Sequence, residues 1–404
     1  MSYRSVVCVY YPHQLLPALV AVMHHRRYCL NEPVEQPTLI HVRILIDNDQ
    51  GRHIADAIQQ IVGKISWLSV EVSYPWKLAF IHEYYLPVKL RAHFIRQRYK
   101  QYSIREIFYA HDLSADFLTQ TFTHAFPKAT RICFGDALGI VYSQDYFTKL
   151  MYSERNLLTQ SIYRRTLHNV KSWLKLKRRQ FVLPKNALKA SFAILILPCD
   201  PGNDVLTNTP FQVPSKSDLQ SILDLLTSGL DCNDSVTEKL IDNTSKPIIF
   251  LALSNLTDSK LARFESELML YQEIVDKHVP KDSLLIIKLH PGTHQTTLMS
   301  LKSKLTHACE IHYIDLEYSV YPIELHKKLL LKADKILSIS YTSISLPYLY
   351  GREVCHVLDN ALIETYFESH AQNWVKKGNQ EYLQMIEELM SWDGKIPLLA
   401  SHKC

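Results

Sequence analysis

A histidine, an aspartate and a group of hydroxyl side chains follow segments that the sequence predicts to be buried strands. The apolar run 284–287 has the length and β-branched content of a parallel strand, and it leads into Lys288-Leu289-His290-Pro291-Gly292. Proline cannot extend a strand ladder and glycine frees the backbone, so the strand should end with His290 at its carboxyl edge. Ligands of open α/β sheets bind beyond that edge. There His290 could donate to a phosphate or exchange a proton near neutral pH, although an ordinary turn histidine is the alternative.

Asp136 is the second candidate for acid–base chemistry. It follows the predicted strand 129–134, within the sequence Gly135-Asp136-Ala137-Leu138-Gly139. A carboxylate between glycines at the carboxyl edge of a strand is well placed to act as a general base. The alternative is that Asp136 is a turn residue without a catalytic role.

Other polar residues at predicted strand or helix ends could hold a nucleotide. Glu324 begins a predicted helix, where it could accept hydrogen bonds from a ribose or simply favour the helix dipole. The segment 338–345 is a strand-to-helix junction rich in hydroxyls, which could bind phosphate or cap the helix. The residues that we predict to bind the nucleotide are Ser254, Asn255, Pro291, Gly292, Glu324, Ser340, Thr342 and Ser343.

Strands and helices alternate along the chain, which is typical of parallel βαβ units. The predicted strands are 6–10, 41–46, 68–72, 106–109, 129–134, 192–197, 248–253, 284–289, 311–314, 335–339 and 354–358. We therefore expect an α/β fold with two Rossmann-like domains that face each other across a cleft. The predicted domains are 1–188 on the acceptor side and 189–375 for the nucleotide sugar, with a helical tail at 376–404.

Composition excludes several classes of protein. The 404 residues suit two domains, and the ten glycines cannot be assembled into a phosphate-binding loop or a dinucleotide fingerprint. The eight cysteines are scattered along the chain, which indicates no disulfide framework. The nineteen histidines form no His-Glu-x-x-His motif, so no metal site is indicated, and we expect no cofactor. No apolar run approaches the ~20 residues of a membrane span, and no secretory signal is recognised. These features predict a cytoplasmic protein.

A basic segment at 149–189 interrupts the alternation. It holds eleven Lys or Arg against one acid, Glu154, in a chain with a net charge of only +5. Such a concentration attracts an anionic polymer or the anionic inner face of a membrane, to which the protein would bind peripherally. A solvated linker helix is the alternative. Nucleic acid is not expected as a partner, because no binding motif accompanies the charge.

The order of these motifs resembles the bacterial sialyltransferases, and the bacterial polysialyltransferase group most closely. An acidic-Gly motif comes first, followed by Lys288-Leu289-His290-Pro291, then Pro322-Ile323-Glu324, and finally the Ser/Thr-rich turn. The early sequence Tyr11-Pro12-His13-Gln14-Leu15 is also similar to a turn of those enzymes. The resemblance implies the two-domain GT-B fold. It also implies inverting, metal-independent transfer of sialic acid from CMP-sialic acid to a glycan acceptor, which could be anionic or lipid-linked.

Carried over by position, the resemblance implies a role for each motif. Asp136 would be the general base that deprotonates the acceptor, and His290 would stabilise or protonate the departing CMP phosphate. Glu324 would hold the nucleotide, and the Ser/Thr-rich turn its phosphate. The family has an acid followed directly by glycine, whereas here Gly139 comes three residues after Asp136, so Asp112 is the reserve candidate. A CMP-Kdo transferase of capsule or lipopolysaccharide assembly and a non-catalytic module that binds anionic glycans are the competing interpretations.

Overall fold

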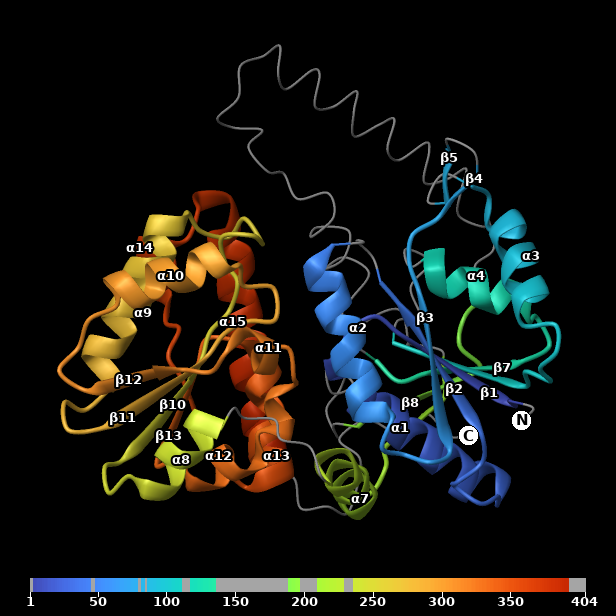
Figure 1. The fold of residues 1–404 in the computed structure, drawn as a ribbon, viewed down its shortest axis with the longest axis horizontal. Helices are drawn as coiled ribbons and strands as arrows, with labels where there is room; N and C mark the ends of the chain where they lie inside the picture. The colour runs from blue at the N-terminus through green and yellow to red at the C-terminus, as the bar shows by residue number, and fades with distance from the viewer. Residues whose placement is uncertain are drawn as a thin grey trace, which may run out of the picture. The chain divides into compact units, whose positions relative to one another are not determined.

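The computed structural model describes residues 3–44, 48–78, 81–83, 86–110, 117–135, 188–196, 209–228 and 235–391. The chain divides into two compact units, the first comprising Met1–Ile222 with Ile396–Cys404 and the second Leu223–Lys395. Each unit has a parallel sheet with helices between its strands (Figure 1). This confirms the predicted α/β class with two Rossmann-like domains, which are the components of a GT-B fold.

The first sheet has seven strands in the order β3-β2-β1-β6-β7-β8-β9. The chain therefore begins in the middle of the sheet, builds one side and then crosses to the other. Its strands are β1 Ser5–Val9, β2 Thr38–Arg43, β3 Leu68–Ser73, β6 Glu106–Tyr109, β7 Thr130–Cys133, β8 Phe192–Ile194 and β9 Phe211–Gln212. Its helices are α1 Leu15–His24, α2 Asp49–Val62, α3 Val88–Arg98 and α4 Phe117–Ala125, with a hairpin of β4 Lys77–Leu78 and β5 Ile81–His82. Helix α7, Lys216–Thr227, spans the boundary between the units.

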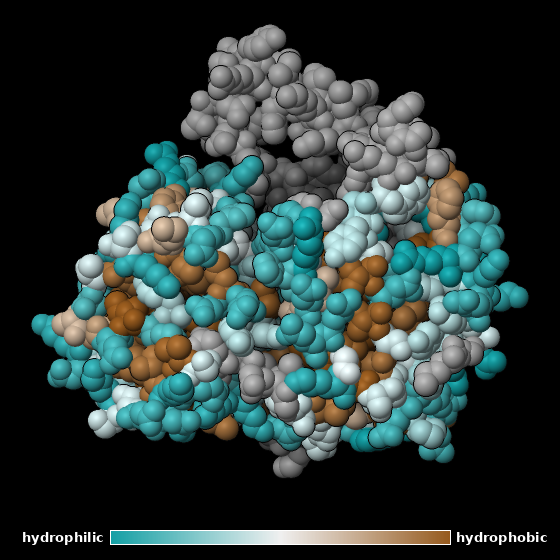
Figure 2. Space-filling model, in the orientation of Figure 1, coloured by the Kyte–Doolittle hydropathy of each residue, from teal (hydrophilic) through white to brown (hydrophobic). Residues whose placement is uncertain are grey.

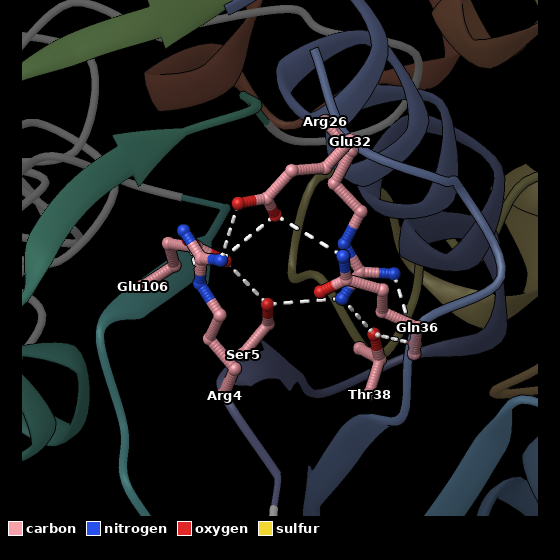
Figure 3. A network of polar contacts seen from close by, with 7 residues as sticks. All are labelled: Arg4, Ser5, Arg26, Glu32, Gln36, Thr38 and Glu106. Atoms are coloured by element: carbon pink, nitrogen blue, oxygen red, sulfur yellow. Dashed lines mark hydrogen bonds and ion pairs between the residues drawn. The ribbon is translucent and has the colours of Figure 1, made fainter. Parts of the chain in front are cut away.

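A buried arginine connects the amino ends of β1 and β2, two neighbouring strands of this sheet (Figure 3). Arg26 lies in a turn of π-helix, His25–Leu30, that continues α1. Its guanidinium donates to Ser5 Oγ at 3.0 Å and to Thr38 Oγ1 at 2.5 Å, which belong to the first residues of β1 and β2. It also donates to the carbonyls of Val34 and Gln36, at 2.6 and 2.9 Å. Burial lowers the pKa of Arg26 to about 10, so the side chain remains charged at neutral pH.

Glu106 extends the same network to a third strand. As the first residue of β6, it accepts hydrogen bonds from Ser5 Oγ at 2.5 Å and Arg4 Nε at 2.8 Å. Arg4 also pairs with Glu32 at 2.6 Å (Figure 3). All of these contacts lie at the amino edge of the sheet, opposite the edge at which ligands bind. We therefore assign the network to stability.

The second sheet has five parallel strands in the order β12-β11-β10-β13-β14. Its strands are β10 Ile248–Ala252, β11 Leu284–Lys288, β12 Glu310–Tyr313, β13 Lys335–Ser338 and β14 Val354–His356. Its longer helices are α8 Ser235–Asn243, α9 Phe264–His278, α10 Gln295–Lys304 and α15 Ser369–Ser391. Its shorter helical elements are α11 Leu316–Ser319, η5 Ile323–Leu325, α12 Lys327–Lys332, η6 Tyr341–Ile344, α13 Ser345–Tyr350 and α14 Asn360–Tyr366.

Apolar side chains bury both faces of this second sheet. Helices α9, α10 and α14 cover one face, where Ile274 and Leu301 pack with Ile287 of β11 (Figure 1). Helices α8, α12 and α13 cover the other, where Leu329 and Ile286 belong to a separate apolar cluster. A strand that is covered on both faces has a continuous apolar sequence, which is why these strands could be predicted from the sequence.

The first sheet continues past the predicted domain boundary at 188/189. The predicted boundary assigns the strand near 192–197 to the second domain, but β8 pairs with β7 of the first sheet, with Phe192 opposite Ile132. A short apolar strand carries no mark of the sheet to which it belongs, so the boundary was set too early. The described part of the predicted tail, 376–391, belongs to α15. The basic segment lies outside the described residues except for positions 188 and 189.

Candidate active site

The predicted nucleotide-binding residues of the second unit come from neighbouring strand ends. In its sheet the order reverses between β10 and β13, and Ala252 is paired with Ser338 at the ends of these strands. Such a reversal is the position at which open α/β sheets bind ligands, beyond the carboxyl ends of the strands. Ser254 and Asn255 follow β10 here, and the turn 340–343 follows β13. The structure thus brings both predicted segments to the same edge.

The loop that carries His290 joins this edge from the next strand. The end of β11 lies beside β10, and Leu253 N donates to Lys288 O at 3.0 Å. Beyond the strands, Asn255 Nδ2 donates to Gly292 O at 3.3 Å. This hydrogen bond connects the loop after β10 with the His-Pro-Gly loop after β11. His290, Gly292 and Asn255, which were predicted separately, therefore belong to one constellation.

The backbone fixes the tautomer of His290. The side chain is exposed, and the N–H of Gly292 donates to its Nδ1 at 3.0 Å. A nitrogen that accepts a hydrogen bond carries no proton, so the neutral ring holds its proton on Nε2. His290 can therefore act as a donor through Nε2 even when the ring is uncharged. Pro291 lies between His290 and Gly292 in the chain.

Glu324 is buried beneath the same region. Its side chain is 4% exposed, and Oε1 accepts a hydrogen bond from Ser345 Oγ at 2.7 Å. The Tyr350 hydroxyl donates to its backbone carbonyl. Both contacts connect η5 with α13, so Glu324 has a structural role in addition to any contact with a ribose. The ribose contact stays a prediction.

The hydroxyls of the Ser/Thr-rich turn have different surroundings. Ser343 is fully buried, with Oγ donating to Ser340 O at 2.8 Å and lying 3.0 Å from the Tyr382 hydroxyl of α15. Ser343 does not cap the helix, because a capping hydroxyl accepts from a backbone N–H, whereas the Ser343 hydroxyl donates to a carbonyl three residues earlier. Ser340 is half-buried, and its N–H donates to Ser338 Oγ at 3.0 Å. Thr342 lies within η6, whose first N–H groups have no acceptor within the helix.

One cation at this edge is buried, and the sequence pattern did not predict a role for it. Lys288, the last residue of β11, is 6% exposed, and its Nζ donates to Ser319 O at 2.8 Å. Burial lowers the pKa of Lys288 to about 8, against the raising effect of the Glu324 charge. A lysine that ends an otherwise apolar strand, Leu-Leu-Ile-Ile-Lys, was the available signal.

In the first unit, the predicted base lies outside the described residues, as does the reserve candidate Asp112. The described stretch 117–135 ends at Gly135, directly before Asp136. Gly135 has a φ of +75°. This conformation favours glycine, so the turn after β7 depends on that residue. Strands β6 and β7 are neighbours, with Tyr109 opposite Cys133.

The turn after β1 lies where the first sheet reverses its order, between β1 and β6. Gln14 is buried, and its Oε1 accepts a hydrogen bond from Tyr10 N at 2.7 Å. Between them, the rings of Tyr11 and His13 stack with their centroids 5.5 Å apart. The turn 11–15 therefore stands at the ligand-binding edge of its own sheet.

A small cavity with a largely apolar lining and a few charged side chains lies at the same edge of the first unit, beside the last residues of β2 and β3. Its volume is about 50 Å³, and its lining includes Arg43, Ser73, Arg91 and His41. Arg43 forms a buried ion pair with Glu83 and donates to Ser73 Oγ at 3.2 Å. Burial, together with nearby arginines, lowers the pKa of His41 to about 3. These residues are distant in the chain, so no local sequence pattern predicts that they meet.

Within the described part of the chain, no group of three or more His, Cys, Asp or Glu side chains could hold a metal ion. No helix in that part is long and apolar enough to cross a membrane. The face seen in Figure 2 is mostly hydrophilic, with scattered apolar patches on both units.

Comparison with known proteins identifies no family. No protein-family model matches the sequence, and no curated protein matches it either. Among solved structures, UDP-N-acetylglucosamine 2-epimerase from Rickettsia bellii is similar at 9% identity and a TM-score of 0.46, covering 96% of this chain and 95% of that one. UDP-GlcNAc 2-epimerase from Neisseria meningitidis, bound to UDP-GlcNAc, is similar at 13% identity and a TM-score of 0.43, covering 98% and 96%.

ADP-heptose lps heptosyltransferase II from E. coli is similar at 10% identity and a TM-score of 0.36, covering 96% of this chain and 99% of that one. None of these three structures is named as a sialyltransferase. All three TM-scores are below 0.5, so the description of the fold rests on the strand order.

Proposed function

We propose that the protein is a glycosyltransferase that transfers sialic acid from CMP-sialic acid to a glycan acceptor. The observation that supports this most is the constellation at the carboxyl edge of the second sheet. There the His290 loop, Asn255 and the hydroxyl turn 340–343 follow three adjacent strands, and the Asn255–Gly292 hydrogen bond joins two of them. An edge with a histidine donor, backbone N–H groups and hydroxyls suits a phosphate.

The proposed reaction is a single displacement. The acceptor oxygen forms a bond to the anomeric carbon as the bond from that carbon to the CMP phosphate breaks, which inverts the centre. Asp136 takes the proton of the acceptor hydroxyl, and the Nε2–H of His290 donates to the departing phosphate oxygen. Glu324 and the turn 340–343 hold the nucleotide, and the first unit provides the acceptor side.

The test is release of CMP from CMP-sialic acid by the full chain, with and without EDTA. CMP-Kdo and UDP-GlcNAc, the ligand named for the meningococcal structure, run in parallel. We expect release from the sialyl donor alone, unaffected by EDTA. Release from CMP-Kdo alone would move the assignment to a Kdo transferase. Binding of glycans without turnover of any donor would indicate a non-catalytic module.

A further inference from the structure

A charged side chain is buried at the end of an apolar strand, directly below the candidate site. Side chains alternate along a strand, so Lys288 shares a face with Leu284 and Ile286, which belong to an apolar cluster. A buried ammonium needs polar partners to offset its lost hydration. Here the Nζ donates to Ser319 O at 2.8 Å and lies 3.4 Å from Leu289 O.

Lys288 and its partners connect three segments of the candidate site. Ser319, which accepts from the ammonium, ends α11 and leads into the turn that carries Glu324. The Glu324 charge interacts with that of Lys288, and the Glu324 carboxylate is held by Ser345 at the start of α13. Two residues after Lys288 comes His290. One buried ammonium therefore bonds to the end of α11 and to the start of the His-Pro loop, and it interacts electrostatically with the Glu324 carboxylate, which Ser345 of α13 holds.

We infer that Lys288 is a positioning residue, which holds the turn 320–325 against the His-Pro loop and so shapes the nucleotide site of the second unit. The inference rests on the proposed function only where it concerns the nucleotide. The positioning of the turn itself follows from the contacts of Lys288. A positive charge beneath the edge also favours an anionic ligand there.

This role makes nucleotide binding depend on pH. Lys288 loses its proton with a pKa of about 8, and its charge-assisted bond to Ser319 weakens as it does so. Two other titratable groups interact with it electrostatically, Glu324 and His326. Burial and the Lys288 charge hold the pKa of His326 well below its usual value, so His326 stays neutral near pH 8. Glu324 raises the pKa of Lys288 and thereby helps to keep it charged.

The first experiment follows amide hydrogen exchange in the full-length Lys288→Met variant. The N–H groups of Leu325 and His326 donate to Pro322 O and Ile323 O, each at 3.1 Å, so they report on the turn. A lost hydrogen bond to a charged group should accelerate their exchange about tenfold or more, with β12 unchanged. The control is Lys281→Met, which replaces an exposed lysine ahead of the same strand. Unchanged exchange at Leu325 and His326 in a folded Lys288→Met protein would overturn the inference.

The second experiment measures CMP affinity by calorimetry at pH 7 and pH 9. We expect the wild-type protein to bind about tenfold more weakly at pH 9, and Lys288→Met to bind weakly at both. Equal affinities of the wild type at the two pH values would contradict the inference. If Lys288→Met does not fold, Glu324→Gln replaces it, and the loss of affinity should then begin below pH 8. A wild-type protein that binds no CMP would sink the proposed function, while the exchange experiment would still decide the role of Lys288.

Discussion

A single backbone N–H determines what His290 can do. Because Gly292 N donates to Nδ1, the ring presents its proton on Nε2 without having to be charged. Proton donation by a positioned side chain contributes roughly 10²–10⁴-fold to a reaction rate. The neighbouring His294 lies in the same loop, is 62% exposed and only approaches Asp258, at 3.8 Å. The two histidines therefore form a matched pair for mutation.

We expect His290→Ala to lower the turnover of CMP-sialic acid at least ~100-fold, since the departing phosphate loses its donor. The measurement is the initial rate of CMP release at saturating donor. His294→Ala should retain a rate close to that of the wild type. Equal rates for His290→Ala and the wild type would remove His290 from the mechanism.

For single residues, the sequence predicted where the site residues lie better than which groups they contact. His290 and Asn255 were identified because a proline, a glycine or a polar pair ended an apolar run. The hydrogen bond of Ser343 could not be predicted, because its partner Tyr382 lies in a helix far along the chain. Lys288 was visible as a residue but not as a buried cation, since burial depends on how α11 and η5 pack over the strand.

At the scale of elements, most strands could be predicted because parallel strands covered on both faces are short apolar runs. The assignment of β8 failed, since its pairing with β7 depends on a partner distant in the chain. The π-helix at His25–Leu30 was also not predicted. Its cause is tertiary: the turn places Arg26 where it reaches the first residues of both β1 and β2.

Arg26 should therefore contribute strongly to the stability of the first unit. We expect Arg26→Met to lower its free energy of unfolding by about 3 kcal/mol, because buried hydroxyl and carbonyl groups lose a charged donor. Denaturant-dependent hydrogen exchange of the β2 amides in the full chain measures this. The control is Arg52→Ala, whose side chain is 59% exposed and lies 3.5 Å from Asp49. An effect no larger than that of the control would show that the network is not stabilising.

At the scale of the whole molecule, each unit contains a histidine that resists protonation, the buried His41 in the first and the half-buried His356 in the second. Burial lowers the pKa of His41 in the first unit to about 3, and that of His356 in the second to about 4, from 6.5. Above pH 6.5 both histidines are neutral in the folded and unfolded chains. Below it the unfolded chain takes up the proton first, so acid favours unfolding until the folded pKa is reached.

We therefore expect both units to lose stability as the pH falls from 6.5 toward 4. Once the pH is well below 6.5, each histidine should reduce the protection of its unit about tenfold per pH unit. Hydrogen exchange of β2 amides reports on His41, and that of the Val357 N–H, which donates to Ser338 O, reports on His356. His41→Gln should reduce the pH dependence of the first unit alone, and the lowered pKa values of His24 and His25 should account for part of what remains. A wild-type first unit whose protection is the same at pH 5 and pH 7 would contradict this account.

The strand order also has a consequence for synthesis on the ribosome. The first sheet begins with an interior strand, β1, yet its last strands, β8 and β9, are translated long after β7. Until β8 has left the ribosome, β7 remains an unpaired edge, and such edges are sites of aggregation. The nascent chain is thus most exposed to misassembly while its middle third is being made. Chaperone capture should concentrate in that window.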